Sequence, residues 1–105
     1  MIIKSKKVFT PNATSDLLVT STVKMLKKKS DILDLGCGTG FVGLSISKNS
    51  RLKNNYYFSD ISPKAIQLCK KNAKKNNIKI EVKTGSIFQP WKNKKFDIIV
   101  ESVSG

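Results

Sequence analysis

Apolar residues recur along this 105-residue chain in two rhythms, one typical of strands and the other typical of helices. The runs expected as strands are residues 31–35, 56–60, 78–85 and 96–103. The segments expected as helices are residues 14–28, 41–49 and 63–77. Because the two kinds alternate and the loops between them are short, the order predicts parallel strands joined by right-handed crossovers. The expected fold class is therefore α/β, comprising the first four strands of a doubly wound parallel sheet.

Capping residues indicate where two of the helices begin. Ser62 is the expected N-cap of the third helix, and Pro63 takes the first helical position, where its missing N–H costs nothing. Thr14 or Ser15 can cap the first helix. The stripe expected on the buried side of that first helix is Leu18, Thr22, Met25 and Leu26.

A glycine-rich segment, "DILDLGCGTGFVG" at residues 31–43, follows the first expected strand and opens the second expected helix. Glycine at this density weakens helices and strands, which indicates that a ligand approaches the backbone closely. Residues 38–43 match the dinucleotide fingerprint G-x-G-x-x-G, and Asp60, twenty residues after Gly40, is placed to bind a ribose. An NAD-type oxidoreductase is therefore one hypothesis.

The same loop resembles another motif more closely. Its pattern from Asp34 to Gly40, acid-x-Gly-x-Gly-x-Gly, is similar to motif I of the class I S-adenosylmethionine-dependent methyltransferases. A carboxylate at the tip of the strand suits the ammonium group of that cofactor. Residues 9–19, 60–78 and 85–100 also resemble segments of the small-domain subfamily of these enzymes. That subfamily includes release-factor glutamine N5-methyltransferases and ribosomal RNA guanine N2-methyltransferases.

The resemblance implies the Rossmann-like fold of the class I methyltransferases. Residues 1–29 would form an N-terminal segment and helix packing on the sheet, and residues 30–105 would form the S-adenosylmethionine-binding half. The implied cofactor site comprises Asp34, Gly36, Cys37, Gly38, Gly40, Asp60, Ile61, Ser86 and Ile87. In this site Asp34 would lie near the methionine amino group, Asp60 would bind both ribose hydroxyls, and Ile61 would pack on the adenine.

Three further positions complete the implied site. Cys37 is expected to be a small residue that fits the loop rather than a nucleophile. Ile87 would offer its backbone N–H to the adenine ring. The family usually has Asp where this chain has Ser86, which accepts a hydrogen bond from the adenine amino group less strongly.

The acceptor side departs from the subfamily. Its pattern would put Asn-Pro-Pro-aromatic at residues 102–105, where this chain has Ser-Val-Ser-Gly. The methyl acceptor and the catalytic residues therefore stay open, with Glu101 and Ser102 as weak candidates. A protein or an RNA of the translation machinery is the acceptor class that the resemblance implies.

The end of the chain raises a second expectation. Class I methyltransferase sheets have seven strands, so a chain that stops after the fourth is expected to be a truncated copy of a longer enzyme. The apolar fourth strand would then be an exposed edge, where self-association or pairing with another chain is expected.

The net charge of +13 at pH 7 comes from 19 Lys and one Arg against seven acidic residues. Lys is enriched together with Asn and Ile, which is typical of a nucleotide-composition bias, and Arg is the residue preferred for bidentate contacts to bases and phosphates. We interpret the excess as a solvated lysine coat. A non-catalytic basic RNA-binding module is the alternative.

Cysteine and histidine usage excludes several kinds of site. Two cysteines are too few for a disulfide-stapled secreted domain, and the absence of His removes His-based triads and the common zinc ligand sets. No apolar run approaches the roughly 18 residues that span a membrane, and no secretion signal is recognisable. The chain is expected to be cytoplasmic, with neither a metal nor a membrane partner.

Overall fold

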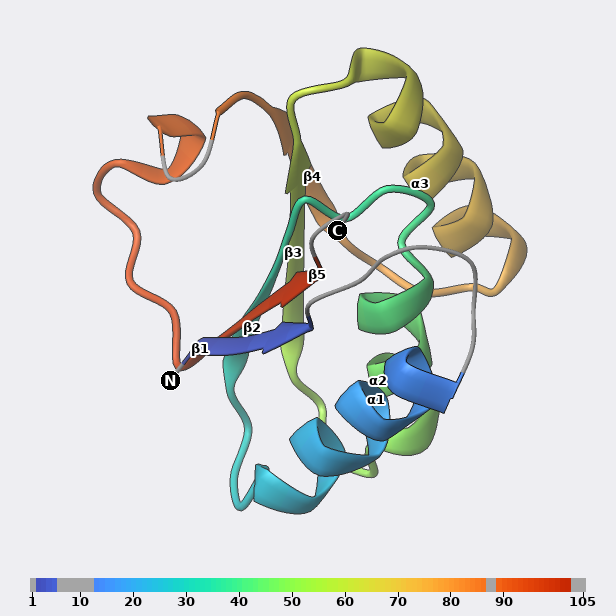
Figure 1. Ribbon diagram of the computed structural model, residues 1–105, viewed down its shortest axis with the longest axis vertical. Coiled ribbons are helices and arrows are strands. Elements are labelled where there is room, and N and C mark those ends of the chain that lie inside the picture. The colour runs from blue at the N-terminus through green and yellow to red at the C-terminus, as the bar shows by residue number, and fades with distance from the viewer. Residues whose placement is uncertain (1, 6–12, 87–88, 103–105) are drawn as a thin grey trace.

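The computed structural model describes residues 2–5, 13–86 and 89–102, which form one parallel sheet and three helices (Figure 1). In chain order the elements are β1 (Ile2–Ser5), α1 (Ala13–Met25), β2 (Asp31–Leu35), α2 (Phe41–Asn49), β3 (Asn55–Asp60), α3 (Pro63–Lys75), β4 (Glu81–Thr84), the 3-10 turn η1 (Gln89–Trp91) and β5 (Ile98–Ser102). The four expected strands and three expected helices are confirmed, and β1 is an additional strand. The expected division of the chain between residues 29 and 30 stays a prediction.

All five strands are parallel, in the order β1-β5-β2-β3-β4. The chain moves outward from β2 through β3 to β4 and returns to the other side of β2 as β5, so the strand order reverses between β2 and β5. Leu35 is in register with Ser59 on one side and with Glu101 on the other. The carboxyl ends of these strands therefore meet at one edge, which is where ligands bind in open α/β sheets.

The strand β1 corrects an expectation about the edge of the sheet. β5 pairs with β2 on one side and with β1 on the other, from Ile2 opposite Ile99 to Ser5 opposite Ser102. The prediction that the apolar fourth strand is an exposed edge is wrong, which removes the basis for self-association through it. The physical reason is that residues 2–5 pair with the backbone groups that an edge strand leaves open.

The two faces of the sheet are covered differently. One face packs against α1, α2 and α3, whereas the segment that joins β4 to β5 crosses the other face (Figure 1). Successive residues of a strand point to opposite faces. The strand residues that pack with the helices are Ile32, Tyr56, Phe58, Ile98 and Val100. The residues that form the core of the other face are Leu33, Leu35, Tyr57, Trp91, Phe96 and Ile99.

Three aromatic side chains close the second face. Tyr57, Trp91 and Phe96 meet edge to face, with ring centroids 5.2 to 5.7 Å apart. Trp91 is only 4% exposed, so its ring covers the core and is not a surface on which a ligand can stack.

The boundaries of α1 differ from those expected. The helix begins at Ala13, so Thr14 and Ser15 lie inside it and neither is its N-cap. It ends at Met25, three residues before the expected end at residue 28.

The buried stripe of α1 differs from the expected one at one position, because Val19 is buried and Met25 is not. Leu18, Val19, Thr22 and Leu26 are buried, whereas Met25 is 38% exposed. The side of the helix that faces the core therefore includes both Leu18 and Val19, and Met25 lies at the boundary between the buried and the exposed side. Thr22 is satisfied inside the core because its hydroxyl donates to the carbonyl oxygen of Leu18 at 2.8 Å.

The start of α3 is confirmed. Ser62 is the N-cap, its Oγ accepts a hydrogen bond from the backbone N–H of Ala65 at 3.2 Å, and Pro63 is the first helical residue. The side chains that α3 buries against the sheet are Ile66, Cys69 and Ala73. The strand that follows, β4, is shorter than expected because residues 78–80 do not pair with β3.

The helix α2 packs so closely on the sheet that one position admits no side chain. A Cβ atom added to Gly43 would overlap the ring of Phe58 and would lie 3.0 Å from Oδ2 of Asp34. The backbone N–H of Gly43 donates to that same oxygen at 2.9 Å. Glycine at this position therefore brings α2 within hydrogen-bond distance of a carboxylate on β2.

We expect Gly43→Ala to lower the free energy of unfolding by about 1–3 kcal/mol, because the added methyl group must displace Phe58 or separate α2 from β2. Urea denaturation followed by circular dichroism measures the change. Lys48→Ala, on the exposed side of the same helix, is the control and should stay within about 0.5 kcal/mol of the wild type. Since Ala is otherwise the better helix former by about 1 kcal/mol, a stabilised Gly43→Ala variant would contradict the close packing.

Candidate functional site

The glycine loop, residues 36–40, folds over the carboxyl ends of two neighbouring strands. The backbone N–H groups of Gly36 and Cys37 both donate to the carbonyl oxygen of Ser59, each at 2.9 Å. Gly40 is the N-cap of α2 and has φ 86°, in the left-handed region that glycine adopts without strain. The loop thus leaves β2, passes the end of β3 and leads directly into α2.

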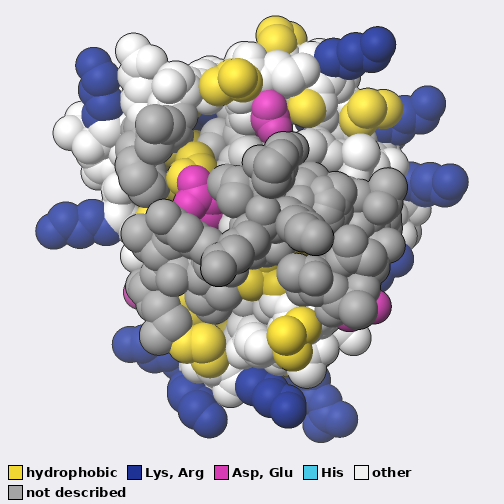
Figure 2. All heavy atoms as spheres, viewed as in Figure 1, with side chains coloured by type: hydrophobic (Ala, Val, Ile, Leu, Met, Phe, Trp, Pro, Cys, Tyr) yellow, Lys and Arg dark blue, Asp and Glu magenta, His cyan; other side chains and the backbone are white. Residues whose placement is uncertain are grey.

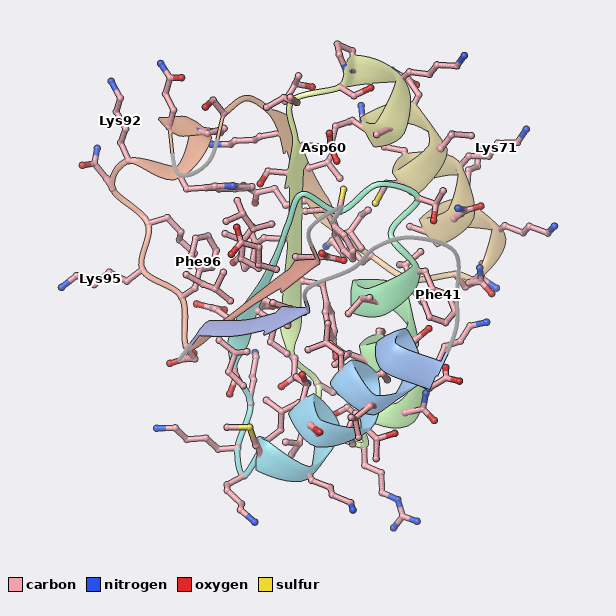
Figure 3. The ribbon with its side chains drawn as sticks, viewed as in Figure 1. Phe41, Asp60, Lys71, Lys92, Lys95 and Phe96 are labelled. Carbon is pink, nitrogen blue, oxygen red and sulfur yellow. The ribbon has the colours of Figure 1, made fainter. Side chains whose placement is uncertain are left out.

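Asp60, the last residue of β3, joins this loop to the start of α3 (Figure 3). Its Oδ2 accepts a hydrogen bond from the N–H of Gly38 at 2.9 Å, and its Oδ1 accepts one from the N–H of Ser62 at 2.9 Å. The backbone carbonyl of Asp60 also accepts from the N–H of Gly85, after β4, at 3.0 Å. Each carboxylate oxygen has two lone pairs, so each keeps one that a ligand hydroxyl can use.

Open space lies next to the backbone of Gly38. A Cβ atom at this position would meet no heavy atom of the described residues within 4 Å beyond its chain neighbours. Its φ of 56° is in the left-handed region, which further favours glycine. A ligand can therefore approach this part of the loop closely, within reach of Asp60.

Asp34 is a buried carboxyl group at the base of the loop, with a relative exposure of 2%. Its Oδ2 accepts the hydrogen bond from Gly43, and its Oδ1 has no hydrogen-bond partner among the described residues. Burial, and to a smaller extent the nearby Asp60 carboxylate, raise the pKa of Asp34 to about 7 against the lowering effect of the Gly43 N–H. A positively charged ligand group near the free oxygen would favour the ionised form.

Cys37 and Cys69 are both buried and not joined in a disulfide. The side chain of Cys69 and burial both raise the pKa of the Cys37 thiol, so it stays protonated. Its Sγ lies 3.7 Å from the carbonyl oxygen of Gly38. This environment agrees with the expectation that Cys37 fills space in the loop.

The remaining predicted cofactor residues follow β3 and β4. Ile61, directly after Asp60, is 72% exposed, which is unusual for an isoleucine. Ser86 is exposed, and its carbonyl oxygen accepts the N–H of Gln89 at 2.9 Å. Ile87 lies outside the described residues.

The two weak catalytic candidates end β5, beside the strand that leads into the glycine loop. Glu101 is half-buried and pairs with Leu35, which precedes Gly36. Ser102 pairs with Ser5 of β1. The structure therefore brings both candidates to the same edge of the sheet as Asp60.

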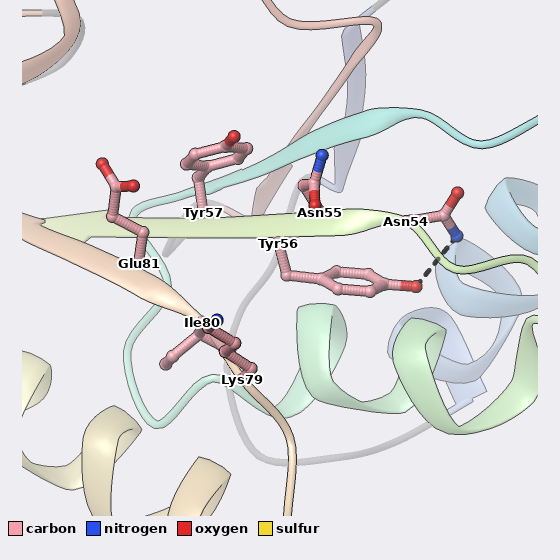
Figure 4. Close-up of a pocket in the computed structure, with 7 residues that line it drawn as sticks. All are labelled: Asn54, Asn55, Tyr56, Tyr57, Lys79, Ile80 and Glu81. Atoms are coloured by element: carbon pink, nitrogen blue, oxygen red, sulfur yellow. Dashed lines mark hydrogen bonds between the residues drawn. The ribbon is translucent and has the colours of Figure 1, made fainter.

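A hollow of about 350 Å³ lies at the other end of β3 and is separate from this edge (Figure 4). Its lining residues are Asn54, Asn55, Tyr56, Tyr57, Lys79, Ile80 and Glu81. Pairing between β3 and β4 begins at Tyr57 and Glu81, so the hollow is the notch where the chain before β4 diverges from β3. It contains none of the predicted site residues.

The comparison with protein families decides between the two interpretations of the glycine loop, as a dinucleotide-binding loop or as a methyltransferase motif. The family model described as the methyltransferase small domain matches residues 2–102. The chain belongs to this family. The expected resemblance is thereby confirmed, and the comparisons give no support to the dinucleotide oxidoreductase or to the non-catalytic RNA-binding module.

Individual relatives agree with the family match. Release factor glutamine methyltransferase of Aquifex aeolicus (strain VF5) is 31% identical over 106 residues, which cover 96% of this chain and 37% of that protein. The crystal structure of a ribosomal protein L11 methylase from Lactobacillus delbrueckii subsp. bulgaricus has a TM-score of 0.74 at 21% identity, over 97% of this chain and 60% of that one. This chain spans less than two thirds of the length of either relative.

The solved structures confirm the expected fold class. Pyrococcus abyssi tRNA (uracil-54, C5)-methyltransferase, solved in complex with S-adenosyl-L-homocysteine, has a TM-score of 0.67 at 24% identity, over 89% of this chain and 23% of that one. The fold is that of the class I methyltransferases, and the family supports S-adenosylmethionine as the cofactor. None of the described helices has the length and apolar character needed to span a membrane.

The sequence did not reveal one hydrogen-bond donor within the site, the backbone N–H of Gly43. Gly43 lies after the motif of alternate glycines, and only the structure shows that its N–H holds the buried carboxylate of Asp34. The available signal was the last glycine of "GTGFVG", because that position of the dinucleotide fingerprint serves close packing of helix on strand.

We expect the free energy of unfolding to fall as the pH rises from about 4 to about 7 because of Asp34. Its folded-state pKa of about 7 lies above the ordinary value of 3.8, so the folded protein binds more protons than the unfolded chain in this window. The contribution is complete below about pH 4 and is lost by about pH 7.

Asp34→Asn isolates this effect, since the amide cannot titrate but keeps an oxygen that accepts from Gly43. Between about pH 5 and pH 7 the wild type should lose about 1–3 kcal/mol relative to this variant, measured by urea denaturation at constant ionic strength. Stabilities of the two proteins that run parallel across this range would contradict the titration of Asp34.

Proposed function

We propose that this chain is the S-adenosylmethionine-binding portion of a methyltransferase whose acceptor belongs to the translation machinery. The observation that carries the proposal is the hydrogen bond from Gly38 to Asp60, beside open backbone and at the end of the sheet where ligands bind. Membership of the family supports methyl transfer. The Aquifex and Lactobacillus relatives are named for a release factor and for ribosomal protein L11, which supports a protein acceptor in the cytoplasm.

The residues at this edge fit the chemical groups of S-adenosylmethionine. The Oδ1 of Asp34, which has no hydrogen-bond partner among the described residues, matches the charge of a methionine ammonium group, acting directly or through water. The remaining lone pairs of Asp60 suit two ribose hydroxyls, and the exposed side chain of Ile61 suits the face of an adenine. The other residues proposed to line the site are Gly36, Cys37, Gly38, Gly40, Ser86 and Ile87.

The chain contributes positioning to the reaction. When bound, S-adenosylmethionine supplies a methyl group on a positively charged sulfur, which is already activated for in-line displacement. The strand ends would hold this donor in one orientation, and positioning of this kind reaches effective molarities of about 10⁵–10⁸ M in favourable cases. Asp34 would release its proton as a cationic group approaches its free oxygen. Glu101 and Ser102 are the candidates to face the acceptor.

S-adenosylhomocysteine should raise the melting temperature of the chain by several degrees at concentrations far above its Kd, whereas NADH should leave it unchanged. Differential scanning fluorimetry measures both shifts. A rise with NADH and none with S-adenosylhomocysteine would overturn the proposal.

Asp60→Asn should weaken S-adenosylhomocysteine binding about 10- to 100-fold, because the charged acceptors for the ribose hydroxyls are replaced by a neutral amide. Isothermal titration calorimetry measures the Kd, and circular dichroism checks that the variant folds. Asp97→Asn is the matched control, with the same change of charge at the opposite end of the sheet, where Asp97 accepts the N–H of Asp31 at 2.8 Å. Equal Kd values for both variants would remove Asp60 from the cofactor site.

A further inference from the structure

A small groove separates α2 from α3 beside the glycine loop. Its volume is about 220 Å³, below the roughly 300–1,000 Å³ of sites for drug-sized ligands. The residues that line it are Thr39, Phe41, Leu44, Ser45, Lys48, Asn72 and Asn76. None of them belongs to the proposed cofactor site, so the groove is a second feature of the surface, with room for one planar ring.

The groove combines an aromatic side chain with amides that are held in place. Phe41 is half-buried, so part of its ring packs on the core while the side chain lines the groove (Figure 3). Asn72 Nδ2 donates to the carbonyl oxygen of Thr39 at 2.9 Å, and Asn76 Nδ2 donates to that of Asn72 at 2.7 Å. Within the described part of the chain neither amide oxygen accepts a hydrogen bond. Both are therefore available to the N–H groups of a nucleobase.

Lysines lie in or next to the groove in the sequence of both helices. Lys48 of α2 lines it, and Lys71 and Lys75 of α3 directly precede two of its lining residues, Asn72 of α3 and the C-cap Asn76. All three side chains are exposed. Figure 2 shows lysine and arginine side chains projecting outward along the side of the molecule that α3 occupies in Figure 1.

All the charged residues of α3 are lysines. The helix holds five lysines among its thirteen residues and no Asp or Glu. Its buried stripe turns the lysines away from the sheet, and none of them forms an ion pair within the described residues. A row of unpaired amines of this kind attracts a polyanion.

We propose that this groove binds single-stranded RNA, with one base against Phe41 and the flanking phosphates at the lysines of the two helices. Bases stack on aromatic side chains, and lysine suits phosphates as a point charge whose binding releases counterions. Lysine is depleted in protein–protein interfaces, which argues against an acidic protein. The apolar stripe of α3 is buried against the sheet, which argues against insertion into a membrane surface.

The test is fluorescence anisotropy of a fluorescein-labelled oligouridine titrated with the full chain at several salt concentrations. The variant Lys48→Gln/Lys71→Gln/Lys75→Gln should bind at least about tenfold more weakly and should reduce the salt slope by about 2, as expected for three lost phosphate contacts to a single strand. The matched control Lys27→Gln/Lys28→Gln/Lys53→Gln removes the same charge from exposed positions outside the groove and α3. Equal losses in both variants would overturn the proposal, because total charge alone would then explain binding.

Phe41→Leu tests the base-binding part separately, since Leu keeps apolar packing but offers no ring. We expect a loss of about 5- to 100-fold in affinity with an unchanged salt slope. Wild-type affinity in this variant, or equally effective competition by polyglutamate or by phosphatidylserine vesicles, would overturn RNA as the ligand. Far-UV circular dichroism and thermal unfolding without ligand show that each variant is folded.

The two proposals fail independently. A wild-type chain that binds oligouridine through the groove but not S-adenosylhomocysteine would overturn the proposed function and leave this inference standing.

Discussion

The arrangement of the carboxyl edge of the sheet depends on the two hydrogen bonds that the carboxylate of Asp60 accepts. This carboxylate binds backbone N–H groups of two segments, the glycine loop at Gly38 and the start of α3 at Ser62. Hydrogen bonds to a charged group contribute about 1.5–3 kcal/mol each, more than neutral ones. The residue that we propose to bind a ribose therefore also holds the loop around it in shape.

A second carboxyl group is buried at an energetic cost. Asp34 lies at the end of β2 under α2, where burial raises its pKa and Gly43 supplies one hydrogen bond. The absence of a side chain at Gly43 permits that bond, since any Cβ there would meet Phe58 and the carboxylate itself. A buried polar atom without a partner destabilises a fold, and titratable groups with strongly shifted pKa values cluster at functional sites.

The lysines that produce the large positive charge have different surroundings on different parts of the surface. Lys94 pairs with Asp31 at 3.0 Å and lies 4.8 Å from the ring centroid of Tyr57, while Lys83 lies 4.8 Å from that of Trp91. These lysines pack against the aromatic side chains on the second face of the sheet and stabilise the fold. The lysines along α3 form no ion pair within the described residues. The nearness of Lys71 and Lys75 to the groove residues Asn72 and Asn76, and not the net charge, distinguishes them from a solvated coat.

Local patterns in the sequence determined most of the elements, because the rhythm of "DILDL" and the pair Ser62–Pro63 act on residues close together in the chain. The alternate glycines and Asp60 carried most of the resemblance to the family, which the match over residues 2–102 confirms. Strand β1 could not be predicted, because "IIKS" is short and becomes a strand only by pairing with β5 at the other end of the chain. The bonds from Asp60 to Gly38 and from Asp34 to Gly43, and the groove between α2 and α3, were decided by the tertiary structure, since they join residues that only the strand order and helix packing bring together.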